Sequence, residues 1–217
     1  MPKKKENILV FCSHSDDQIF GPGATLAKYS EQGKNIYTYI FSYGEQSLAW
    51  LKPKLAKKIR VEEAKKADKI IGGKKVEFFG LKEGKFAKEI EKNNIRSKLQ
   101  RIILSKKPLK IFTHSPEDPH PDHRAVYHAV MRSLEEINYN CHVYAFDIWN
   151  PFTFKKKELP RLYEDVTENF AKKIKALKVF ESQKASLFVL FWSVYVKAII
   201  HGFHVHKRYA ERFFKVR

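Results

Sequence analysis

Residues 7–18, NILVFCSHSDDQ, decide the fold class of this chain. The first six are almost continuously apolar, which is typical of a strand buried on both faces in a parallel sheet. A polar loop follows, and Gly21-Pro22-Gly23 then introduces a helical pattern over 24–32 that ends at Gly33. A buried strand that runs through a loop into a helix is the repeating unit of α/β proteins.

The remainder of the chain continues this alternation of strand and helix. Strand patterns at 35–41, 75–79, 109–113 and 142–148 alternate with helical patterns at 54–71, 90–105, 125–134 and 166–180, and an apolar helix follows Ala185. This order predicts an α/β fold with a doubly wound, mostly parallel, Rossmann-like sheet and helices on both faces. Because the 217 residues show no internal repeat and no linker, we expect a single domain over 1–217.

The charge balance is strongly basic. Lysine and arginine number 42 against 24 aspartates and glutamates, which gives a formal net charge of +18. Such a balance favours anions, whether on a small substrate, on nucleic acid or on a membrane surface. The lysines are scattered as surface lysines are, and no nucleic-acid-binding motif is recognisable. We therefore expect a small-molecule substrate, anionic or neutral, and no specific nucleic-acid partner; a homo-oligomer is compatible with the sequence.

Cysteine content and apolar runs indicate a reducing, non-membrane environment. Only Cys12 and Cys141 are present, so no disulfide framework is expected. The first residues contain no apolar segment typical of a signal peptide. The longest apolar run, Ala185–Val196, is shorter than the roughly 20 residues that span a membrane, so we expect a buried or interfacial helix and no transmembrane segment. These features predict a cytoplasmic protein.

The loop after the first strand concentrates histidine and carboxylate groups as His14-Ser15-Asp16-Asp17. Catalytic zinc sites use histidine nitrogen and aspartate oxygen from three protein ligands and keep one position open for water. Residues three apart in a tight turn can converge, so His14 and Asp17 suit two ligands, and Asp16 suits a base that takes a proton from water. The alternative is a helix N-cap, which explains one aspartate but not the histidine and the pair.

A second loop, 114–123, places three histidines and three carboxylates within ten residues. His123 opens a helix and completes a triad of metal ligands with His14 and Asp17. Asp122 is expected to orient a histidine through its second ring nitrogen, or else to cap the helix. His120 remains free to donate a hydrogen bond to an oxyanion or a proton to a leaving amine. His114 is expected only to end the strand or cap the loop.

The two loops should meet, because sites in parallel sheets form beyond the carboxyl ends of the strands. Together they resemble a known family. His14-Ser-Asp-Asp-Gln18 and His120-Pro-Asp-His123 are similar to the two signatures of the LmbE-like (PIG-L) N-acetylglucosaminyl deacetylases, usually His-Pro-Asp-Asp-Glu and His-Pro-Asp-His. Weaker likenesses extend over nearly the whole chain: Gly23, Tyr43-Gly44-Glu45, Arg60 with Glu63, Lys175-Ala176-Leu177, Ser182-Gln183 and Ala210-Glu211-Arg212-Phe213.

The resemblance implies a doubly wound, LmbE-like fold and a zinc-dependent enzyme that hydrolyses the acetamide of an N-acetylglucosamine-containing substrate. It implies zinc, or another divalent ion, on His14, Asp17 and His123, with Asp16 as general base and His120 assisting the transition state. It also implies that Arg60 contacts the sugar. From the residues alone, Arg60 is equally a solvated helix residue paired with Glu63 or Glu62.

Two departures from the family pattern stand in the first motif. Ser15 replaces the usual proline and should loosen the loop. Gln18 replaces the usual glutamate, which puts activity or substrate choice in question. Trp149, after the last predicted strand, is a candidate for stacking on a sugar ring.

Two other functions are compatible with the sequence. An amidase acting on another sugar conjugate or amide would use the same metal and water chemistry. A non-enzymatic binder of nucleic acid or anionic membrane would use the basic surface, and its affinity would fall steeply with salt.

Overall fold

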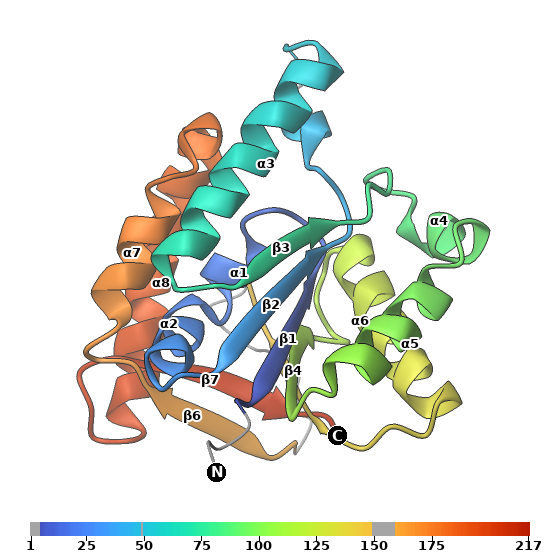
Figure 1. The fold of residues 1–217 in the computed structure, drawn as a ribbon. Helices are drawn as coiled ribbons and strands as arrows, with labels where there is room; N and C mark the ends of the chain where they lie inside the picture. The colour runs from blue at the N-terminus through green and yellow to red at the C-terminus, as the bar shows by residue number, and fades with distance from the viewer. Residues whose placement is uncertain (1–4, 49, 149–158) are drawn as a thin grey trace.

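The computed structural model describes residues 5–48, 50–148 and 159–217. A seven-stranded sheet in the order β3-β2-β1-β4-β5-β7-β6 lies between two layers of helices (Figure 1). Five neighbouring strands are parallel: β1 (Asn7–Cys12), β2 (Asn35–Ile40), β3 (Lys75–Phe78), β4 (Lys110–His114) and β5 (His142–Phe146). The prediction of a doubly wound, mostly parallel sheet is therefore confirmed.

Helices cover both faces of the sheet because the buried strands are apolar on both sides. In β1, Ile8 and Val10 join one apolar cluster whereas Leu9 and Phe11 join the other. The first cluster lies under α1 (Asp17–Phe20), α2 (Gly23–Glu31), α3 (Pro53–Ile70), α7 (Phe170–Leu177) and α8 (Lys184–Phe203). The second lies under α4 (Phe86–Lys92), α5 (Ile95–Lys106) and α6 (Pro121–Glu136), on the opposite side of the sheet in Figure 1.

The strand order places a crevice between β1 and β4. From β1 the chain winds outward through β2 to β3, and then returns to pair β4 with the other side of β1. At such a reversal the loops after the two central strands separate and leave space beyond their carboxyl ends. The loops that begin at Ser13 and Ser115 are the two that flank this crevice.

Three features differ from the sequence prediction. The helix expected over 90–105 is two helices, because Asn94 adopts a left-handed conformation with φ 50° between α4 and α5. Two strands were not predicted: β6 (Arg161–Asp165) and β7 (Ala210–Lys215), which pair antiparallel with each other, and β7 with β5. Both carry charged residues that hide the apolar alternation of a strand.

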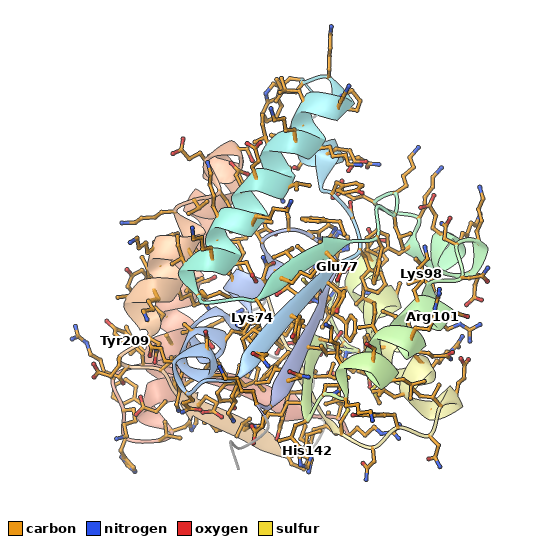
Figure 2. The ribbon with its side chains drawn as sticks, in the orientation of Figure 1. Lys74, Glu77, Lys98, Arg101, His142 and Tyr209 are labelled. Carbon is orange, nitrogen blue, oxygen red and sulfur yellow. The ribbon has the colours of Figure 1, made fainter. Side chains whose placement is uncertain are left out.

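Exposed basic side chains stand on separate elements of the fold. Lys98 and Arg101 project outward from α5, well apart from Lys74, which precedes β3, in the same view (Figure 2). Cys12 and Cys141 are buried and free. Among the described residues, no helix combines the length and apolar character needed to cross a membrane.

Candidate metal centre

The loops after β1 and β4 bring His14, Asp17 and His123 together. His123 Nε2 lies 3.3 Å from His14 Nδ1 and 3.7 Å from Asp17 Oδ2, and His14 Nδ1 lies 3.5 Å from Asp17 Oδ2. Ligand atoms bound to one tetrahedral zinc ion at about 2.0–2.2 Å stand roughly 3.3–3.6 Å apart. The three predicted ligands therefore fit a divalent ion in both donor type and separation.

Local backbone geometry fixes the position of Asp17. The backbone N–H groups of Ser13 and His14 donate to Asp17 Oδ2 at 3.1 and 2.7 Å, so the loop folds around this carboxylate before α1 begins. Burial alone would raise the pKa of Asp17, yet His123 and the side chain of His14 hold that pKa well below its usual range. The carboxylate stays ionised, as a metal ligand must.

His14 shows that this cluster attracts positive charge. Burial lowers its pKa, but Asp17, Glu83 and Asp16 outweigh this effect and raise the pKa to about 9. The carboxylates thus stabilise a proton on His14, and a divalent ion would satisfy the same excess of negative charge. Glu83 was not predicted from the sequence; its Oε1 lies 3.8 Å from His14 Nε2. It follows β3 and carries no motif that marks it.

Two other groups of three ligands lie in the same cluster: His14, His120 and Asp122, and His114, Asp118 and His123. The second group is wholly buried, so it has no open position for substrate. The predicted triad differs, because His14 and Asp17 line a cavity of about 200 Å³. It is the group best suited to a catalytic ion.

His114 belongs to the site, although the sequence analysis assigned it only a strand-ending role. It does end β4, but its buried ring stacks on His123 with centroids 3.9 Å apart, and its Nε2 lies 3.2 Å from Asp17 Oδ2. Burial and the neighbouring His123 lower its pKa to about 4, so the ring is neutral. The sequence feature that could have indicated this role is the position of His114 in a loop with two other histidines.

Asp118, which the sequence did not single out, is the carboxylate nearest the second ring nitrogen of a predicted ligand. Asp118 Oδ1 lies 3.0 Å from His123 Nδ1, as in the common carboxylate–histidine–metal arrangement. Asp122 Oδ2 instead accepts a hydrogen bond from Gly84 N at 2.7 Å and lies 3.9 Å from His14 Nε2. Asp118 thus lies within hydrogen-bonding distance of the second nitrogen of His123, while Asp122 lies farther from the second nitrogen of His14.

His120 lies beside the ligands and caps α6. Its Nδ1 accepts a hydrogen bond from Asp122 N at 3.2 Å, and its ring centroid lies 5.1 Å from that of His14 and 4.7 Å from that of His123. Burial and the two histidines lower its pKa, so the ring is neutral near pH 7. Since Nδ1 is the acceptor, we assign the ring proton to Nε2.

Asp16 and Arg60 meet on the pocket side of the triad. Arg60 is 2% exposed, so it is not the solvated surface base considered above, although its Nη1 lies 3.9 Å from Glu63. Its Nη2 lies 3.5 Å from Asp16 Oδ2. Gly44 makes this possible, because its φ is +77° and a Cβ there would stand 2.8 Å from Arg60 Nε.

Two of the weaker family-like residues, Arg60 and Gln183, line the same pocket. Ser182 donates from its backbone N and its hydroxyl to Glu63, and Gln183 Nε2 donates to Ser47 Oγ at 3.0 Å. The cavity is lined by His14, Asp16, Asp17, Phe20, Ser47, Arg60, Glu83, Ile148, Gln183 and Leu190. His120 is not among these residues, and Trp149 lies outside the described part of the chain.

Gln18 does not face the cavity. It is fully buried, and its Nε2 donates to Ser15 O at 3.1 Å within the loop. The amide therefore ties the loop together without adding a charge beneath the ligands. The second departure, Ser15, is also buried.

Comparisons with known proteins identify the relatives of this chain. Residues 9–134 match the family model described as PIG-L, GlcNAc-PI de-N-acetylase. An uncharacterised deacetylase, YaiS, of Escherichia coli is 27% identical over 185 residues, which cover 82% of this chain and 92% of that protein. The 4-oxalmesaconate hydratase of Pseudomonas putida is 26% identical over 203 residues, covering 85% and 76%. The N,N'-diacetylchitobiose deacetylase of Pyrococcus horikoshii shares the fold with a TM-score of 0.81 at 21% identity, over 99% of this chain and 85% of that chain.

Proposed function

Because this chain belongs to the PIG-L family, we propose that it is a metal-dependent hydrolase that removes the N-acetyl group from an N-acetylglucosamine-containing substrate. The observation that carries the proposal is the triad of His14, Asp17 and His123, whose ligand atoms are spaced for one ion beside a cavity. These residues would hold a divalent ion, zinc as the first choice. The ion would supply Lewis acidity and lower the pKa of water to about 7.

Asp16 is the proposed general base. It adjoins the ligand Asp17, lines the cavity, and has no contact that commits its carboxylate to the metal triad. The guanidinium of Arg60 lies 3.5 Å away and holds the carboxylate in place at the cavity.

His120 is the proposed hydrogen-bond donor to the oxyanion that develops when water attacks the acetamide carbonyl. Its neutral ring carries the proton on Nε2, because Nδ1 is occupied by the backbone N–H of Asp122. The cap also fixes the orientation of the ring, so the same hydrogen bond sets both the tautomer and the direction of donation. Once Asp16 has taken the proton from water, it passes that proton to the departing amine, while His120 donates its hydrogen bond to the oxyanion.

The cavity suits one sugar ring. Arg60, Ser47 and Gln183 offer hydrogen-bonding groups, while Phe20, Ile148 and Leu190 offer apolar surface. A pyranose presents both kinds of surface, and Arg60 is placed to bind a hydroxyl or an anionic substituent. An amidase acting on another sugar conjugate would use the same residues with a different pocket occupant.

A hydratase is the second candidate function, because the Pseudomonas relative named above is a hydratase of comparable identity. Water activation by a metal and a carboxylate serves addition to a carbon–carbon double bond as well as amide hydrolysis. The two reactions differ in product, since only the hydrolase releases acetate.

The decisive assay measures acetate from the zinc-loaded protein with N-acetylglucosamine, its phosphorylated form and N,N'-diacetylchitobiose. We expect acetate and a free amine in equal amounts from at least one of them. Hydration of an unsaturated dicarboxylic acid with no acetate from any acetylated sugar would replace the proposal by the hydratase alternative. Release from non-sugar amides alone would support the amidase.

A further inference from the structure

Helix α8 exposes a run of large apolar side chains. Nine such side chains are exposed in the described part of the chain, and five of them lie on this one helix. Trp192 is 54% exposed and Phe203 is 76% exposed. We call the outer face of α8 the surface formed by Trp192, Tyr195, Ile199, Ile200 and Phe203.

These five side chains form a single face. At 100° per residue they fall within an arc of about 140° on the helix. The opposite face of α8 packs on the core through Leu190, Val194 and Ala198, next to Ser193, Lys197 and His201. The helix is thus held in place by its inner face, and the large apolar side chains of the outer face are not needed for that packing. The outer face of α8 is therefore a surface built to be covered by a partner.

The charge around this face is positive. The segment 184–209 contains no aspartate or glutamate. Its end carries exposed His204, His206, Lys207 and Arg208 directly after Phe203, and of these Lys207 has Asp165 at 3.6 Å. An apolar face that continues into a basic turn is complementary to an anionic lipid surface, where tryptophan and tyrosine also favour the headgroup region.

We propose that the outer face of α8 docks the protein onto anionic membrane surfaces as a peripheral protein. A second copy of this chain is the less suitable occupant, because each copy carries a net charge of +18 and the basic turns would be brought together. The other face of the same helix reaches the cavity through Leu190, so docking would hold the cavity near the lipid. The inference is independent of the proposed function.

The test is co-sedimentation of the full-length protein with vesicles of phosphatidylcholine containing 30% phosphatidylglycerol, and with phosphatidylcholine alone. We expect binding to the anionic vesicles that weakens steeply between 0.05 and 0.5 M salt. Trp192→Ser/Phe203→Ser should weaken it at least about tenfold, because two anchoring aromatic side chains are removed. Lys207→Gln/Arg208→Gln should reduce affinity by about tenfold.

The matched control is Trp50→Ser/Leu104→Ser, which removes two large side chains, 75% and 49% exposed, from outside α8. It should bind vesicles like the unaltered protein. Absence of vesicle binding, or binding that the α8 variant leaves unchanged, would overturn the proposal. If light scattering instead shows a dimer that only the α8 variant disrupts, the outer face is a contact between copies and the proposal is wrong.

Discussion

Residues 9–134 and residues 135–217 are built for different tasks. The first region holds β1 to β4 in parallel and contributes every proposed ligand, the base and the oxyanion donor. The second adds β5, two antiparallel strands and α8, and it contributes pocket wall at Ile148, Gln183 and Leu190. It also carries the exposed apolar face of α8. The proposed chemistry thus lies in the first region, and the second supplies part of the pocket wall and the exposed face of α8.

The largest effect expected is from removing a ligand in the first region. Asp17→Ala deletes one of three proposed ligands and leaves His14 N without its acceptor, while Ser13 N keeps only His114 Nε2. Acetate release should fall at least about 10⁴-fold. Glu168→Ala, an exposed carboxylate of the second region, is the control and should be unchanged. Comparable losses in both variants would erase the distinction between the regions.

His120→Asn tests the proposed hydrogen-bond donor to the oxyanion with the least disturbance. Asparagine is a good N-cap, so α6 should keep its start while the donor is lost. Turnover should fall about 10²- to 10³-fold with KM little altered. The measurement is steady-state kinetics with thermal unfolding alongside. A large fall in Tm with normal turnover would make His120 a cap and nothing more.

Glu211→Gln tests the second region. Glu211 accepts hydrogen bonds from Ala24 N and Thr25 N at the start of α2 and from Lys173 Nζ at 2.6 Å, all of them buried. Breaking this pair should cost about 2–4 kcal/mol in urea unfolding, while turnover of the folded protein stays within about twofold. A loss of turnover without a loss of stability would place Glu211 in the chemistry.

Asp68→Asn tests a buried carboxylate of the first region that lies outside the proposed metal site. Burial raises the pKa of Asp68 to about 6, against roughly 3.9 in the unfolded chain, and only Thr38 donates to it. The folded state therefore binds more protons between about pH 4 and 6, so stability falls as pH rises through this window. The variant should gain about 1–3 kcal/mol at pH 7.5 and little at pH 4. An equal gain at both pH values would contradict this origin.

The first region was also the one that the sequence predicted best. β1 begins and ends where its apolar run predicts, and the triad needed only two motifs and the rule that parallel strands share a carboxyl edge. His114, Asp118 and Glu83 were missed, because their roles depend on which ring nitrogen faces which carboxylate. Spacing along the chain does not determine such contacts.

The second region was harder for a physical reason. β6 and β7 lie at the antiparallel end of the sheet, where one side is less buried and charged residues such as Arg161 and Glu211 interrupt the apolar alternation. The sequence predicted that α8 is an apolar helix. It could not predict which face of α8 is exposed, because that depends on how the rest of the fold packs against the helix.

Metal analysis of purified variants tests the central claim most directly. The protein, Asp16→Asn and His120→Asn should each retain about one divalent ion per chain, whereas His14→Ala, Asp17→Ala and His123→Ala should retain almost none. Asp16→Asn should at the same time lose turnover steeply. Retention of the ion by the triad variants, or its loss from Asp16→Asn, would show that ligands and base have been assigned to the wrong residues.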